Sequence, residues 1–280
     1  MRLNPIVVGA LYPSIRRGLS ADLLATQSLG GTPFPICTAH VVAGDGVVTD
    51  VLNVPTDTVS AQLEHVFQTR SPTSAKIGII GATPTIATVF DHLQTLDGPV
   101  VYDLTVSGPS GEDVLGQGGL DVVTDHLNVP DLVTIRLNDA SLVAGMEIPS
   151  LDDAQVAAQR LAQQGARRVL IRCGKLPTHF FDKEATPPDY ALDLFFDGND
   201  FALFEAPYLS NMEELHGASS GLLLPLVKHL QEGMELEPAL QRAKGRVSEA
   251  LRAAQHDSAN QGATFFTALE QEPTITETEA

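Results

Sequence analysis

Hydrophobic residues recur along this chain with two alternating periods. Short runs rich in apolar and β-branched residues, such as Pro5–Leu11 and Leu132–Leu137, predict buried strands. Between such runs, apolar residues three and four positions apart predict amphipathic helices. One covers Ser20–Leu29, where the Ser20 hydroxyl is suited to cap the first turn. Strands that alternate with helices indicate a mainly parallel sheet covered by helices on both faces.

The remaining elements continue this alternation up to Gly174. Further strands are predicted at Phe34–Ala43, Lys76–Ile80, Val100–Val106 and Arg168–Cys173, and further helices at Thr56–Arg70, Thr85–Leu96, Leu151–Gln164 and Glu237–Ala254. Beyond Gly174, Lys175–Asp189 reads as a proline-containing loop. Asp197–Asp200 then predicts the turn of an antiparallel hairpin between Tyr190–Phe196 and Phe201–Leu209. We expect one domain over residues 1–270 and a disordered acidic segment over residues 271–280.

Composition narrows the class of protein. The net charge of −18 argues against a nucleic-acid binder, although local arginines could still hold an anionic small ligand in one pocket. No apolar run is long enough to cross a membrane, and no secretory signal begins the sequence, so we expect a cytoplasmic protein. Cys37 and Cys173 are too few for a disulfide framework or a structural zinc site.

A small-residue stretch, His216–Gly221, precedes an apolar run that predicts a helix. Unpaired N–H groups and the positive end of the helix dipole would make this stretch a phosphate cradle, but an ordinary capped loop fits the same residues. Gly217, Ser219 and Gly221 also match the nucleophile elbow of hydrolases. No strand precedes them here, which argues against that chemistry.

Charged residues follow the predicted strands. Asp103, Asp139 and Arg172 each lie at or just after the end of one. In open α/β sheets, ligands bind beyond the carboxyl ends of the strands, and two acids with an arginine suit a magnesium–phosphate ligand. Each residue alone is more typical of a helix cap or a surface charge.

Taken in order, the motifs of this chain resemble the hydroxymethylpyrimidine/phosphomethylpyrimidine kinases of the ribokinase-like superfamily. KIGII at residues 76–80 resembles the family's KIGML, VLIRCG at 169–174 its VLVKGG, and HGASSGL at 216–222 its HGTGCTL. The likeness covers about residues 5–255. It implies a three-layer α/β/α sandwich, ATP with Mg²⁺ as the phosphoryl donor, a pyrimidine-like small substrate and a homodimer.

The resemblance also implies roles for individual residues. The catalytic loop would consist of Gly217, Ser219, Ser220 and Gly221, and the metal would be held by Asp103 and Asp139. The nucleotide and its phosphates would contact Thr134, Arg136 and Arg172. The substrate would contact Tyr12, His40, Ile80 and Val106.

Two departures from the family fall on the chemistry. Ser220 replaces the Cys or Asp that serves as base, and Ser219 replaces an anion-hole glycine, so we expect its Cβ to disturb the loop. Either the chain is a working small-molecule kinase with altered specificity, or it is a catalytically impaired homologue that binds a ligand or regulates. On the first hypothesis, Ser220→Asp should raise turnover and Ser219→Gly should add to the gain.

Overall fold

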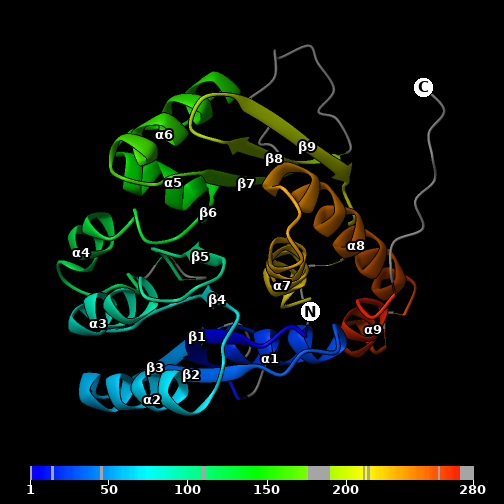
Figure 1. The fold of residues 1–280 in the computed structure, drawn as a ribbon. Helices are drawn as coiled ribbons and strands as arrows, with labels where there is room; N and C mark the ends of the chain where they lie inside the picture. Colours follow the sequence, from blue (N-terminus) through cyan, green and yellow to red (C-terminus); the bar gives the residue numbers. More distant parts are fainter. Residues whose placement is uncertain are drawn as a thin grey trace.

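The computed structural model describes residues 2–271 except 14–15, 45–46, 109–110, 112, 176–189, 211, 213–214 and 258. The described strands form one sheet (Figure 1). In sheet order they are β3 (Val47–Asn53), β2 (Phe34–Gly44), β1 (Pro5–Leu11), β4 (Ser74–Ile77), β5 (Val100–Leu104), β6 (Leu132–Arg136), β7 (Val169–Lys175), β8 (Tyr190–Phe196) and β9 (Phe201–Pro207).

The sheet is parallel from β2 to β7 and antiparallel at both edges, where β3 pairs with β2 and β8 pairs with β7 and β9. Residues Val169–Ile171 of β7 are buried because helices cover both faces of the sheet. The Asp197 carboxylate accepts bonds from the backbone N–H groups of Asn199 and Asp200, which fixes the turn of the β8–β9 hairpin.

Helices cover the two faces unequally (Figure 1). One face carries α2 (Thr56–Thr69), α3 (Thr83–Leu93), α4 (Gly119–Asp125), α5 (Leu137–Ala144) and α6 (Leu151–Gln163); the other carries α1 (Leu19–Ser28), α7 (Ala218–Gln231), α8 (Leu236–His256) and α9 (Gln261–Ala268). Each face has its own hydrophobic core. The three-layer α/β/α sandwich with a mainly parallel sheet and an edge hairpin is therefore confirmed.

Several boundaries differ from the sequence-based expectation. Helix α1 begins at Leu19 after Gly18, so Ser20 lies inside the helix, where its hydroxyl donates to the Tyr12 carbonyl (3.1 Å) instead of capping the first turn. Strand β4 ends at Ile77, earlier than expected. Strand β3 and helices α4, α5 and α9 had no clear local pattern. Residues 176–189 of the expected loop and residues 272–280 of the expected acidic segment lie outside the described residues.

The strand order reverses beside β1. From β1 the chain runs outward to β2 and β3, then returns to place β4 on the other side of β1. A reversal of this kind leaves a crevice between the loops at the carboxyl ends of the two strands, where ligands bind in open α/β sheets. No helix in the described part of the chain is long and apolar enough to cross a membrane.

Candidate functional site

A polar cleft of about 260 Å³ lies at this reversal. Tyr12 and Gly18 line it after β1, Gly78 and Ile79 after β4, and Thr105 after β5. The first residues of α7 close its opposite wall. Cationic side chains also reach the cleft, namely Arg17, Lys76, Arg136 and Arg172. A chain of net charge −18 thus gathers positive charge where an anionic ligand would bind.

The wall made by α7 is the start of a helix aimed at the cleft. Gly217 precedes the helix with φ 99°, a left-handed conformation that suits glycine, and a Cβ there would lie 2.6 Å from the Phe266 ring. The N–H of Gly221 bonds the Gly217 carbonyl (2.9 Å), so the N–H groups of residues 218–220 precede the intrahelical ladder. These are the donors that bind anions at helix N-termini.

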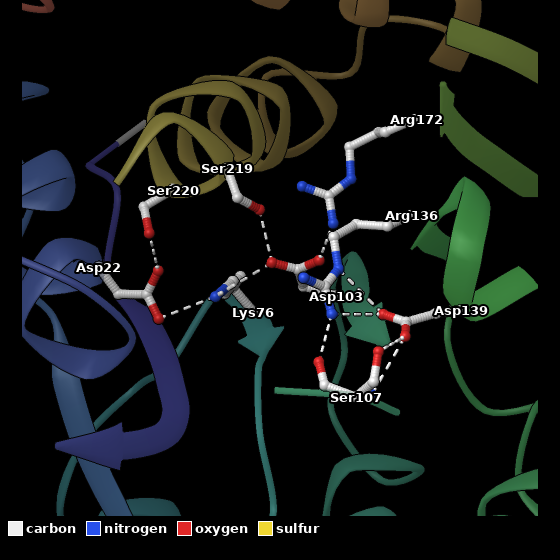
Figure 2. Close-up of polar contacts among 9 residues, drawn as sticks. All are labelled: Asp22, Lys76, Asp103, Ser107, Arg136, Asp139, Arg172, Ser219 and Ser220. Atoms are coloured by element: carbon white, nitrogen blue, oxygen red, sulfur yellow. Dashed lines mark hydrogen bonds and ion pairs between the residues drawn. The ribbon is translucent and has the colours of Figure 1, made fainter. Parts of the chain in front are cut away.

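Ser219 fits this helix without disturbing it, contrary to the expectation that its Cβ would interfere. It occupies the first turn of α7, and its hydroxyl donates to Oδ2 of Asp103 (2.5 Å; Figure 2). A glycine here would lose that hydrogen bond and place a flexible residue in the helix. We therefore no longer expect Ser219→Gly to raise turnover.

Asp103, at the end of β5, is held by several groups. The Arg172 guanidinium lies 2.6 Å from Oδ1 and the Lys76 ammonium 4.0 Å from Oδ2 (Figure 2). Burial acts to raise the pKa of Asp103, but Arg172, Lys76 and the Ser219 hydroxyl outweigh burial and lower it. The carboxylate is therefore ionised and partly neutralises the cations around it.

A second buried carboxylate, Asp22 of α1, meets Ser220 and Lys76. The Ser220 hydroxyl donates to Oδ1 (2.7 Å), and the Lys76 ammonium lies 2.9 Å from Oδ2 (Figure 2). Asp22 is fully buried, and this burial raises its pKa despite the attraction of Lys76. Ser220 itself lines the cleft, so it stands between Asp22 and any ligand.

Asp139, expected beside Asp103 as a metal ligand, lies behind the cleft. It is fully buried in the first turn of α5, and its carboxylate accepts hydrogen bonds from Ser107 Oγ (2.5 Å) and from Arg136 Nη2 (2.7 Å). Arg136 also donates to the Ser107 carbonyl. Asp139 thus fixes the position of Arg136, which does line the cleft. Among the described residues, no three His, Cys, Asp or Glu side chains form a group that could hold a metal.

The four residues expected to contact substrate are divided. Tyr12 lines the cleft, but His40 on β2 is exposed and does not. Ile80 and Val106 are buried in the core on the α3 side. Their predecessors Ile79 and Thr105 line the cleft instead, because successive side chains of an extended chain point to opposite sides.

Thr134, expected to contact the nucleotide, is fully buried in β6 and does not line the cleft. A second cavity, of about 270 Å³, lies between the β8–β9 hairpin and α8. It meets the first at Arg172 and Ser219, which line both. Val247 and Leu251 of α8 give it an apolar wall.

Sequence reasoning missed Asp22 and Lys76 as parts of the site. Asp22 lies on the buried face of α1 and Lys76 in the buried strand β4, and a charged residue at a core-facing position is itself a signal of a buried partner. The second cavity had no such signal, because its apolar residues follow ordinary helix and strand patterns.

Comparison with known proteins shows the family of this chain and its fold. A family model described as phosphomethylpyrimidine kinase covers residues 16–265. The hydroxymethylpyrimidine/phosphomethylpyrimidine kinase of Rhizobium meliloti is 29% identical over 248 residues, which are 88% of this chain and 89% of the relative. The enzyme of the same name from Aquifex aeolicus is 26% identical over 240 residues, or 84% and 89% of the two chains.

Solved structures share the architecture. The ADP complex of Bacillus subtilis pyridoxal kinase superposes with a TM-score of 0.77 at 21% identity, covering 90% of this chain and 93% of that one. The phosphomethylpyrimidine kinase of Clostridium difficile gives a TM-score of 0.71 at 19% identity, covering 87% and 96%. At such identities the likeness establishes the fold.

Proposed function

This chain belongs to the phosphomethylpyrimidine kinase family, and on that premise we propose that it transfers the γ-phosphoryl group of ATP to a hydroxymethylpyrimidine or a related small heterocyclic alcohol. The observation that carries the proposal is the pair of cavities that meet at Arg172 and Ser219. Phosphoryl transfer needs the acceptor oxygen to face the γ-phosphorus of ATP, with positive charge around the transferring group.

The apolar cavity beside α8 suits the base and ribose of ATP. Its position lets the phosphates extend past Arg172 toward the start of α7. There the N–H groups of residues 218–220 and the side chains of Lys76 and Arg136 would bind the transferring group. Fixed donors of this kind stabilise charge that develops in the transition state.

The acceptor alcohol would lie in the polar cleft between Tyr12 and Ile79. Its hydroxyl would then face Ser220 at the end of the anion-binding turn. Tyr12 and Ile79 line the cleft where the ring of the substrate would sit. We therefore assign the choice of acceptor to this wall.

Magnesium fits the cleft through one carboxylate. Asp103 faces the cleft, whereas Asp139 is buried and engaged by Arg136. Mg²⁺ commonly takes one or two carboxylates together with substrate phosphates and water, so Asp103 would contact it directly or through water. When bound, the ion would neutralise charge on the transferring phosphates.

A binding and turnover experiment tests the proposal. Purified protein is heated with Mg-ADP and Mg-ATP, and phosphorylated product is then measured with hydroxymethylpyrimidine and with pyridoxal as acceptors. A nucleotide at a hundred times its Kd should add about 2.7 kcal/mol of stability. Nucleotide binding without product from either acceptor would favour the impaired homologue, and absence of nucleotide binding would overturn the kinase function.

We further propose that the chain forms a homodimer through β2 and β3. Val42 and Leu52 are 53% and 60% exposed, and the antiparallel register places both on one face of these strands, where a second copy could cover them. Sedimentation of the protein and of Leu52→Glu would test this, since a dimer that uses this surface should dissociate in the variant.

A further inference from the structure

Ser220 poses a chemical problem that the structure helps to resolve. A serine hydroxyl has a very high pKa and is a poor acceptor for the proton of a substrate alcohol. In this protein, however, the Ser220 proton is donated to Oδ1 of Asp22 at 2.7 Å. The serine oxygen is therefore free to accept a second proton as it releases its own.

Asp22 has the character of a proton acceptor. It is fully buried among Lys76, Ser220 and the backbone of α1, and it cannot touch a ligand directly. Burial raises its pKa, which makes the carboxylate more basic than an exposed one. The Lys76 ammonium at 2.9 Å acts against burial and favours the ionised form that can accept a proton.

We propose that Asp22 accepts the proton of the acceptor alcohol through the Ser220 hydroxyl. This inference rests on the proposed kinase function. The alcohol O–H breaks and its proton moves to Ser220 Oγ while the Ser220 proton moves to Asp22 Oδ1. The alcohol oxygen bonds to the γ-phosphorus of ATP, and the bond between that phosphorus and the β,γ-bridging oxygen breaks with its electron pair left on ADP. The proton returns through Ser220 to solvent after the products leave.

This arrangement changes the expectation for Ser220→Asp. The new carboxylate would stand beside Asp22 in a buried site, where two like charges cannot both stay ionised. We now expect that variant to be less stable than the wild type and no faster. Ser220→Cys is the better replacement, because the thiolate form of cysteine can accept the proton of the alcohol directly. This change also introduces no second carboxylate.

A double-mutant cycle tests the relay. Asp22→Asn and Ser220→Ala should each lower kcat by about 10²–10⁴-fold, and the double variant should be no slower than the worse single one, because both remove the same path. Thr26→Ala is the matched control. Thr26 is buried in α1 and donates to the Asp22 carbonyl (2.8 Å), so this change perturbs the helix and leaves the carboxylate in place; kcat should stay within about twofold.

A purely structural role for Asp22 gives a different result. If Asp22 only holds Lys76 or anchors α1, its substitution will slow the Ser220→Ala enzyme as much as it slows the wild type, which refutes the relay. Ser220→Ala with kcat within twofold of the wild type refutes it as well, whether or not Asp22→Asn folds.

A measurement without turnover separates the relay from the kinase function. In Ser220→Cys the new thiol should donate to Asp22, and a negative neighbour disfavours the thiolate. The pKa of this thiol is followed by thiolate absorbance. It should fall by at least about one unit when Asp22→Asn is added. The signal of Cys37 and Cys173 is subtracted with the unmodified protein. An unchanged thiol pKa refutes the coupling even if the enzyme is active, and a shifted pKa supports it even if the chosen acceptor is wrong.

Discussion

The ion pair between Arg172 and Asp103 offers a test of the electrostatics of the cleft. Arg172→Met keeps much of the side-chain volume and removes the charge. The two side chains are only 17% and 11% exposed, and the bond is 2.6 Å long, so the pair counts as buried. Breaking a buried pair from one side typically costs about 3–5 kcal/mol.

The remaining partners of Asp103 reduce that cost. Lys76 stays 4.0 Å away and the Ser219 hydroxyl still donates, so the carboxylate keeps part of its support. We expect a loss of about 2–3 kcal/mol. At about 2.1 cal/mol/K per residue, the unfolding entropy of 280 residues is about 0.6 kcal/mol/K, so the Tm should fall by about 3–5 °C.

Thermal and urea unfolding between pH 3 and pH 8 would measure the stability lost in Arg172→Met and the direction in which this loss changes with pH. The lowered pKa of Asp103 means that its contribution is present above the ordinary pKa of aspartic acid and is lost as the pH falls through the lowered value. The difference between wild type and Arg172→Met should therefore shrink below about pH 4. Mg-ADP should also stabilise the variant less, since Arg172 lines both cavities.

Arg167→Met is the control for removing an arginine. Arg167 forms an ion pair with Asp131 at 3.3 Å, but its side chain is 56% exposed and lies outside both cavities. Exposed pairs contribute about 0–1 kcal/mol, so the Tm should change by less than about 2 °C. An Arg172→Met protein as stable as this control at pH 7, or a deficit that persists unchanged at low pH, would refute the electrostatic account.

Three further variants test separate parts of the site. Gly217→Ala should weaken Mg-ADP binding, measured by titration calorimetry, because its Cβ would lie 2.6 Å from the Phe266 ring and φ 99° disfavours alanine; unchanged affinity would show that the loop is not the phosphate site. Lys76→Met should lower the free energy of unfolding in urea by about 3–5 kcal/mol, since it leaves Asp22 buried without a counter-charge; a loss below 1 kcal/mol would contradict this. Leu251→Trp should fill the second cavity and raise the KM for ATP with little change in Tm; an unchanged KM would place the nucleotide elsewhere.

Local pattern was sufficient for much of the architecture. Consecutive apolar residues in Pro5–Leu11 and the Asp197-Gly198 turn predicted β1 and the edge hairpin, because the burial of a central strand and the geometry of a tight turn depend on neighbours in sequence. Strand β3 was missed because its residues Val51 and Leu52 stay exposed at a sheet edge, so no burial pattern marks them.

The site depended on contacts between distant residues. Asp103 and Arg172 could be expected at one edge, since both end parallel strands of one sheet. The sequence could not predict which side chains enter the cleft. Ile79 lines it where Ile80 was predicted, because successive side chains of an extended chain point to opposite faces. Asp22 and Ser220 are 198 positions apart and come together only because α1 and α7 pack on the same face of the sheet. Periodicity assigns each helix a buried face, but it carries no information on which buried polar groups will meet there, and in this protein that pairing positions the proton acceptor that we propose.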